Sequence, residues 1–189
     1  MPPSTDTHPR VRAATEADLP AITALYAQEV RERVATYEYE VPSLEDMHSR
    51  WRRLVDHGFP YLVAEAADGF AGYAYAGPYR SRIGYQWTVE NAIYIDPGQQ
   101  GRGVGRALLQ ALIDACEAQG FRQMVAVIGD GSNAASVRLH ERLGFSTVGV
   151  YRGLGRKHGR WLDTVQMQRA LGAGDASAPP GPAVPHWPG

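Results

Sequence analysis

The chain has 189 residues, of which 44% are hydrophobic and 21% charged, and its formal net charge is −1. These values suit one globular domain with a sizeable core, and they argue against nucleic-acid binding, which needs a surplus of Lys and Arg. No apolar run approaches the roughly 20 residues of a membrane span, and the polar start of the chain lacks the apolar core of a signal peptide.

The first part of the chain predicts one short strand and two helices. Residues 10–14 alternate as a strand does, whereas residues 1–9 show no period and predict a flexible arm. Thr15 and Ser43 each precede a stretch of helical periodicity, which predicts two helices, joined by a tyrosine-rich loop, over residues 15–30 and 43–57.

Three strands are predicted next. Residues 61–66 and 70–77 flank an Asp-Gly pair, which favours the tight turn of a hairpin, and residues 85–95 form the third strand. A glycine-rich segment then leads into a helix that runs to Gln119, where Gly120 ends it.

The last part of the chain predicts a strand over 123–129, a helix over 132–144 and two strands around a glycine-rich turn over 145–171. Residues 172–189 are rich in proline and poor in core-forming side chains, which predicts a disordered tail after a domain of residues 10–171. The order of elements predicts an α+β fold with a mixed, mostly antiparallel sheet. A parallel pair is expected only where a helix crosses between two strands.

The single cysteine, Cys116, excludes an internal disulfide and suits a reducing compartment, so we expect a cytoplasmic protein. Cys116 continues the apolar stripe of its helix, so it is expected to be a core residue and not a nucleophile.

Three glycines, Gly101, Gly103 and Gly105, stand where the helix after residue 95 begins. Unpaired N–H groups and the positive end of the helix dipole make such a place an anion site, and glycines let a diphosphate approach the backbone. A dinucleotide fingerprint fits poorly, because Leu108 stands where its last small residue belongs. A kinase-type phosphate loop fits no better, because the segment contains no lysine.

The segment from Gln100 to Gly105 matches Q/R-x-x-G-x-G/A and resembles the GNAT superfamily of acyl-CoA N-acyltransferases. Residues 133–145 resemble a second motif of that family, N-x-x-A/S-x-x-L-Y-x-x-x-G-F, with His140 where many members carry a tyrosine. Together with residues 75–82 and 87–91, His140 narrows the resemblance to the phosphinothricin N-acetyltransferase branch.

The resemblance implies the GNAT fold and acetyl-CoA as acyl donor, with no metal. It assigns three groups of residues to coenzyme A: those that bind the pyrophosphate, those whose side chains contact the pantetheine arm, and those that offer the backbone of a strand that splays from its parallel neighbour. The residues, in that order, are Gln100, Gly101, Arg102, Gly103, Val104, Gly105 and Arg106; Asn133 and Ser136; and Ile93, Tyr94 and Ile95.

Two side chains are candidates for the proton transfers that acetylation of an amine requires. The resemblance makes Glu90 the base, and the alternative is a glutamate on the solvated face of an edge strand. His140 takes the position of the general acid or shares the base role, and the alternative is a half-buried packing histidine. The sequence does not separate these roles.

The implied substrate is a small amino acid analogue with an acidic or oxidised head group, such as phosphinothricin, methionine sulfoximine or methionine sulfone. Guanidinium groups suit such head groups, and the branch places Tyr37, Arg80, Arg82 and Tyr85 around the amino acid. The resemblance also implies a homodimer and a role in detoxification, hence herbicide resistance. A protein or peptide N-acetyltransferase and a non-catalytic acyl-CoA sensor are the alternatives, and a sensor could dispense with Glu90 and His140.

Overall fold

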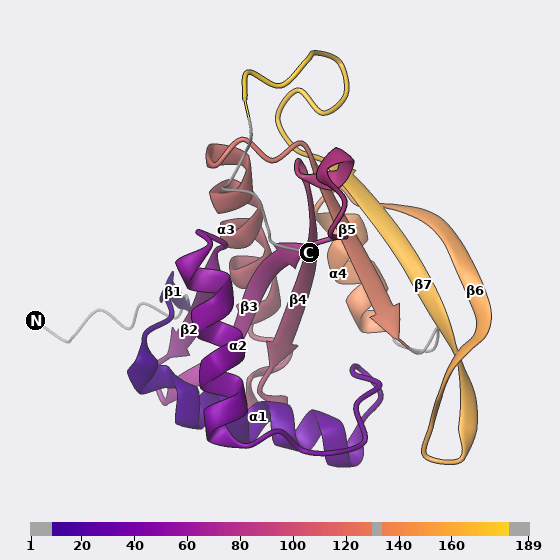
Figure 1. The fold of residues 1–189 in the computed structure, drawn as a ribbon. Helices are drawn as coiled ribbons and strands as arrows, with labels where there is room; N and C mark the ends of the chain where they lie inside the picture. The colour runs from indigo at the N-terminus through magenta and orange to yellow at the C-terminus, as the bar shows by residue number, and fades with distance from the viewer. Residues whose placement is uncertain (1–8, 130–133, 182–189) are drawn as a thin grey trace, which may run out of the picture.

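The computed structural model describes residues 9–129 and 134–181, which form one mixed sheet with helices on both faces (Figure 1). The strands are β1 Arg10–Ala13, β2 Tyr61–Ala66, β3 Gly69–Pro78, β4 Thr88–Ile95, β5 Gln123–Gly129, β6 Ser146–Lys157 and β7 Arg160–Ala170. The helices are α1 Leu19–Glu32, α2 Leu44–Asp56, α3 Val104–Ala118 and α4 Ala134–Arg142. The predicted order of elements is confirmed.

Two predicted elements start later than expected. The first helix begins at Leu19 because residues 16–18 form a 3-10 turn, and the strand predicted from residue 85 begins at Thr88 because residues 83–85 form another. Ser43 caps α2 as predicted, since its hydroxyl accepts a hydrogen bond from the Asp46 N–H at 3.0 Å. The predicted start of the helix at residues 132 and 133 lies outside the described residues.

The sheet has the strand order β1-β2-β3-β4-β5-β7-β6. Every neighbouring pair is antiparallel except β4 and β5, which are joined through α3 and run parallel. A helical crossover returns the chain to the same end of the sheet, so it permits parallel pairing where a tight turn does not. The single parallel pair therefore lies at a helical crossover, as predicted.

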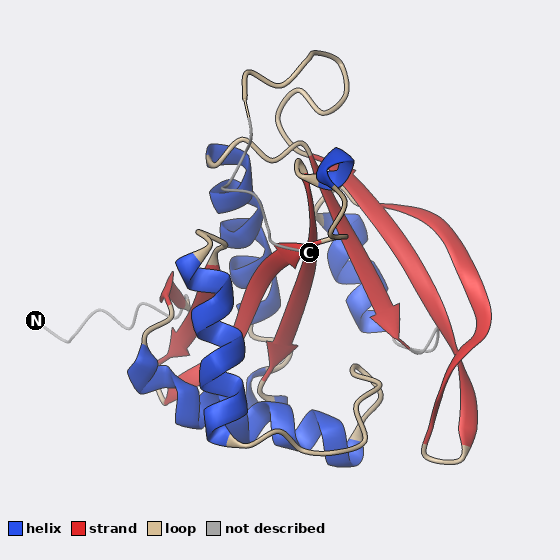
Figure 2. Cartoon of the chain, viewed as in Figure 1, coloured by secondary structure: helices blue, strands red, loops and turns tan. Residues whose placement is uncertain are grey.

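Helices cover both faces of the sheet (Figure 2), and the buried side chains form two clusters, one on each face. The apolar stripe of α3, which includes Leu108, Leu112 and Cys116, packs on one face. Helices α1 and α2 cover the other face, where Tyr61 and Tyr73 stack with their ring centroids 5.8 Å apart. The sheet is thus buried on both sides at β3, and β3 pairs with β4.

The first part of the predicted tail, residues 172–181, lies against the amino ends of β4 and β5. The Trp87 indole donates a hydrogen bond to the Gly181 carbonyl at 2.7 Å. The Arg122 guanidinium contacts the Gly174 and Ala178 carbonyls at 3.5 and 3.4 Å. These contacts use backbone oxygens, so they do not need the apolar side chains that the segment lacks. Residues 182–189 lie outside the described part of the chain, as do residues 1–8 of the predicted arm.

Replacement of Cys116 by alanine tests its assignment to the core. The side chain is fully buried, and burial raises the pKa of the thiol to about 12, so little thiolate exists at neutral pH. We expect Cys116→Ala to lower the free energy of unfolding by about 1 kcal/mol, measured by denaturant titration, with turnover retained. An acetyl group trapped on this thiol during turnover would contradict the assignment.

Candidate active site

A pocket of about 310 Å³ opens where β4 and β5 separate. Their pairing ends at Asn91 and Ala126, although β4 continues to Ile95 and β5 to Gly129. The strand that ends at Ile95 therefore splays from its parallel neighbour, as expected. Its separated part exposes backbone N–H and C=O groups that an extended polar ligand can pair with.

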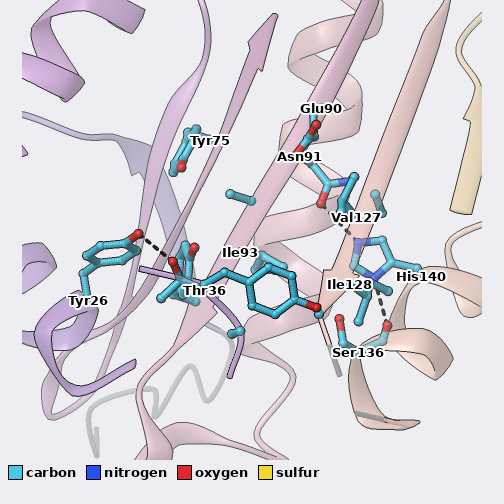
Figure 3. Close-up of a pocket in the computed structure, with 16 residues that line it drawn as sticks. Tyr26, Thr36, Tyr75, Glu90, Asn91, Ile93, Val127, Ile128, Ser136 and His140 are labelled. Atoms are coloured by element: carbon cyan, nitrogen blue, oxygen red, sulfur yellow. Dashed lines mark hydrogen bonds between the residues drawn. The ribbon is translucent and has the colours of Figure 1, made fainter. Parts of the chain in front are cut away.

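Six parts of the chain line this pocket (Figure 3). They are α1, the loop that follows it, and then β3, β4, β5 and α4. The lining residues are Tyr26, Ala35, Thr36, Tyr37, Tyr75, Glu90, Asn91, Ala92, Ile93, Tyr94, Ala126, Val127, Ile128, Gly129, Ser136 and His140. Both candidate catalytic side chains, Glu90 and His140, are among them.

Glu90 is a half-buried carboxylate on β4. No hydrogen bond or ion pair joins it to another of the described residues, and burial alone raises its pKa. Its charge helps to raise the pKa of the lining residue Tyr75 to about 12, after the larger effect of burial. A carboxylate in apolar surroundings holds a proton more tightly than one in water, which makes it a stronger base. The solvated edge-strand alternative for Glu90 is wrong, since β4 lies inside the sheet.

His140 is almost fully buried on α4, with 1% of its surface exposed. Its Nδ1 lies 2.8 Å from the Ser136 carbonyl oxygen, and its Nε2 lies 3.2 Å from Asn91 Oδ1. The ring also meets Phe145 edge to face at 4.9 Å. Burial lowers the pKa of His140, while the hydrogen bond to Ser136 opposes that shift. The histidine thus packs in the core and borders the pocket at the same time.

Asn91 links the protonation of His140 to a hydrogen bond with strand β5. Its Nδ2 donates to the Val125 carbonyl of β5 at 3.3 Å, which turns Oδ1 toward the histidine (Figure 3). The Ser136 carbonyl can only accept, so the Nδ1–H of His140 donates to it. A second donation, from Nε2 to Asn91, requires the charged imidazolium, whereas a neutral ring needs the Asn91 amide reversed. The ionisation of His140 and the orientation of Asn91 therefore depend on each other.

Residues 96–103, which include a 3-10 turn, join β4 to α3, and the amino end of α3 lies beside the end of β4, since a Cβ on Gly105 would lie 3.8 Å from Ile95 Cγ1. Gly103 occupies the N-cap position with φ 82°, and no side chain caps the helix. Gly101 also has a positive φ, 77°, and a Cβ at either glycine would meet nothing within 4 Å. Both positions thus need glycine for their backbone conformation and face open space. An uncapped helix start with accessible N–H groups fits the pyrophosphate of coenzyme A.

Gly105 has a different reason to be glycine. A Cβ there would lie 3.2 Å from Leu139 Cδ2, so the missing side chain lets α3 approach α4 closely. Val104 is buried in the core and can offer a ligand only its backbone. Arg102 donates to Gln99 Oε1 at 2.7 Å and lies 3.3 Å from Asp68, whereas Gln100 and Arg106 are exposed.

The structure places only one of the residues predicted to contact the amino acid in the pocket. Tyr37 lines the pocket, but Arg80, Arg82 and Tyr85 do not. The latter three lie in the loop between β3 and β4, where the Arg80 guanidinium stands 5.6 Å from the Tyr85 ring centroid. Among the cofactor candidates, Ile93, Tyr94 and Ser136 line the pocket, Ile95 ends β4 just beyond it, and Asn133 lies outside the described residues.

Several residues that line the pocket were not predicted from the sequence. Asn91 interrupts an otherwise apolar alternation with Val89 and Ile93, and a polar residue on a buried strand face could have signalled a site. Tyr26 and Tyr75 carry no such signal, because aromatic residues at helix and strand spacing usually belong to a core.

Comparison with known proteins agrees with this geometry. The model of the GNAT acetyltransferase domain matches residues 11–166. A phosphinothricin N-acetyltransferase from Alcaligenes faecalis is 48% identical over 169 residues, covering 89% of this chain and 86% of the relative. An L-methionine sulfoximine/L-methionine sulfone acetyltransferase from Pseudomonas aeruginosa PAO1 is 42% identical over 162 residues, covering 85% and 94%. A crystal structure of a phosphinothricin acetyltransferase from Sinorhizobium meliloti in complex with acetyl-CoA superposes with a TM-score of 0.88 at 46% identity, covering 90% and 92%.

The chain therefore belongs to the GNAT acetyltransferase family, and it is an N-acetyltransferase. Within residues 9–129 and 134–181, no three His, Cys, Asp or Glu side chains gather in a way that could hold a metal ion. None of the helices described is long and apolar enough to cross a membrane.

Because folding raises the pKa of Glu90, this carboxyl lowers stability as the pH rises. The unfolded chain loses the proton at a lower pH than the folded chain, so the free energy of unfolding falls as pH increases between the two pKa values. We expect Glu90→Gln to raise the melting temperature at pH 7–8 and to change it less at pH 4. The exposed Glu40→Gln serves as control. Equal effects of Glu90→Gln at both pH values would contradict the cost assigned to this charge.

Proposed function

We propose that this enzyme transfers an acetyl group from acetyl-CoA to the α-amino group of a small amino acid analogue with an acidic or oxidised head group. The observation that carries the proposal is the half-buried carboxylate of Glu90 in a pocket between separated strands, next to an uncapped helix start. Phosphinothricin, methionine sulfoximine and methionine sulfone are the candidate substrates, because the relatives that match almost the whole chain are named for them.

Glu90 is the proposed base. An α-amino group titrates near 7.7–8.0 in peptides, so at neutral pH most of it is ammonium and has no lone pair for attack. The Glu90 carboxylate removes this proton inside the pocket, and its raised pKa brings it closer to that of the amine. The amine then attacks the thioester carbonyl directly within a ternary complex. No protein nucleophile is needed, which agrees with the buried thiol of Cys116.

His140 is the proposed acid for the departing thiolate, or it shares the base role with Glu90. Its imidazolium form is favoured by two acceptor oxygens, Ser136 O and Asn91 Oδ1, and disfavoured by burial. A proton delivered from this ring would release the contact to Asn91.

Acetyl-CoA is proposed to bind along the gap between β4 and β5, where backbone groups of Ile93, Tyr94 and Ile95 meet the pantetheine arm. One N–H directed at the acyl oxygen would stabilise negative charge there. The pyrophosphate would lie on the N–H groups at the start of α3, among residues Gln100 to Arg106. Asn133 and Ser136 are the proposed side-chain contacts.

Tyr37 is the proposed contact for the amino acid inside the pocket. Arg80, Arg82 and Tyr85 would recognise the acidic head group from the β3–β4 loop, which begins one strand pair away from Glu90. Both arginines are exposed, so their planar donors are available to a carboxylate or phosphinate.

A cytoplasmic homodimer is proposed as the working form, with detoxification of such analogues, including herbicides, as its role. The edge strand β6 supports the dimer. It exposes Val148, Tyr151 and Leu154, while Trp161 on β7 is 69% exposed. An edge strand with exposed apolar side chains is suited to pairing with another chain.

A turnover screen tests this proposal. Purified enzyme and acetyl-CoA should acetylate phosphinothricin, methionine sulfoximine or methionine sulfone faster than a neutral arylamine. Arg80→Ala and Arg82→Ala should raise KM for the amino acid about tenfold and leave KM for acetyl-CoA unchanged, because they remove charge-assisted contacts to one substrate only. Equal loss with the arylamine would show that the arginines do not recognise an acidic group, and no turnover of any analogue would refute the proposed substrate class.

The pH dependence of Glu90→Gln tests the base. A positioned acid–base group contributes roughly 10²–10⁴ in rate, while holding both reactants together supplies more, so the variant should be slow but active. Raising the pH supplies neutral amine without help from the enzyme. We therefore expect the rate deficit of Glu90→Gln to narrow steadily from about pH 7 to pH 9.5, and that of His140→Ala to narrow less. A constant deficit for Glu90→Gln would make Glu90 a substrate-positioning group, with His140 the next candidate for the base.

A further inference from the structure

The pocket residue Tyr37 depends on a part of the chain more than 100 residues away. It lies in the loop between α1 and α2, but its hydroxyl bonds to Thr164 Oγ1 on β7 at 2.8 Å. The ring therefore joins the loop between α1 and α2 to the β6–β7 hairpin. This bridge needs space on the hairpin as well as a partner for the hydroxyl.

Two glycines provide that space. A Cβ built on Gly155 of β6 would lie 2.5 Å from Tyr37 Cε2 and 2.6 Å from Cζ, distances at which the ring or the strand has to move. A Cβ on Gly129 of β5 would lie 3.3 Å from the same ring and 2.9 Å from the Val34 carbonyl oxygen. Neither glycine has a positive φ, so backbone conformation does not explain them. Their close contact with the loop that contains Tyr37 explains why both residues are glycines.

Lys157, two residues after Gly155, holds the backbone of the same loop. The lysine is 1% exposed, which is rare for this residue type. Its ammonium donates to the Thr36 carbonyl at 2.7 Å and to the Glu29 carbonyl, in the last turn of α1, at 3.3 Å. Burial lowers the pKa of Lys157, and the charges of Glu29 and Glu38 oppose that shift. The donated bonds fix the peptide group directly before Tyr37.

The hairpin tip makes two more contacts with this loop. His158, in the turn between β6 and β7, places Nε2 3.2 Å from the Arg33 carbonyl, and the Tyr39 hydroxyl donates to the Arg156 carbonyl. Residues 155–158 thus meet the loop from its beginning to beyond Tyr37. The amino-acid side of the pocket is held from outside by a strand that does not line it.

We propose that Gly155 and Lys157 are positioning residues that hold Tyr37 in place as a wall of the pocket and thereby support binding of the amino acid that is acetylated. The proposal rests on the proposed function. It adds residues that do not line the pocket and act through Tyr37 and the peptide group before it.

Gly155→Ala is the direct test, with Gly149→Ala as its matched control. Both glycines lie on β6, and a Cβ at Gly149 would meet nothing within 4 Å. We expect Gly155→Ala to raise KM for the small amino acid analogue about tenfold or more while KM for acetyl-CoA stays unchanged, since small displacements of a positioning group are costly. Gly149→Ala should match wild type. Equal kinetics of the two variants would overturn the proposal.

A double-mutant cycle separates positioning from general damage to the fold. With the ring removed by Tyr37→Ala, adding Gly155→Ala should change KM for the amino acid by less than about twofold, because the two sites act through one contact. Additive effects would overturn the proposal. If Gly155→Ala does not fold, Lys157→Met takes its place. It should raise the same KM, and an unchanged KM in that variant would also overturn the proposal.

A readout without turnover distinguishes failure of this proposal from failure of the proposed function. In ¹³C-tyrosine NMR of the free protein, Tyr37→Phe identifies the Tyr37 ring signal. Gly155→Ala should shift that signal, and Gly149→Ala should not. If wild type acetylates no analogue but the signal shifts, the substrate class is wrong and the positioning stands. An unshifted signal refutes the positioning, whatever the enzyme acetylates.

Discussion

The separation of two parallel strands is the constraint on which the rest of the site depends. Strands β4 and β5 stop pairing after Asn91 and Ala126, yet both continue in extended form. They remain extended strands because each keeps its other neighbour: β3 pairs with β4 as far as Ile95, and β7 pairs with β5 as far as Gly129. Backbone groups left unpaired in this way are costly, and a bound polar chain can satisfy them. A ligand bound in the opening would therefore stabilise the separated strands.

Polar side chains gather at the point of separation, and they weaken the fold there. Glu90 places a carboxylate in apolar surroundings, and Asn91 and His140 bury four polar atoms whose hydrogen bonds constrain one another. A core of the same shape made of apolar residues would avoid these costs. Their presence in an otherwise well-packed sheet indicates a functional site, because catalysis needs groups whose pKa values have been shifted.

The two sides of the pocket are supported in different ways. On the side proposed for acetyl-CoA, α3 packs closely on α4 through Gly105 and presents an uncapped start, so this side depends on local sequence and one contact between helices. On the side proposed for the amino acid, the loop after α1 contacts α1 and α2, and Lys157 and Thr164 of the far hairpin also hold it. This difference fits an enzyme family that keeps one cofactor and varies its second substrate, since the second side can change through distant residues.

The sequence by itself determined the order of the elements and the glycine-rich helix start, because these follow from local periodicity, caps and short motifs, and the family resemblance made Glu90 a candidate base. It did not locate the start of β4, since the 3-10 turn at residues 83–85 continues the apolar pattern. Only the tertiary structure decided that Tyr26 and Tyr75 face the pocket, that Asn91 orients His140, and that Arg80 and Arg82 lie outside the lining. The bridge from Tyr37 to Thr164 joins residues 127 positions apart. Such a contact depends on how strands are placed in space, and no local pattern encodes it.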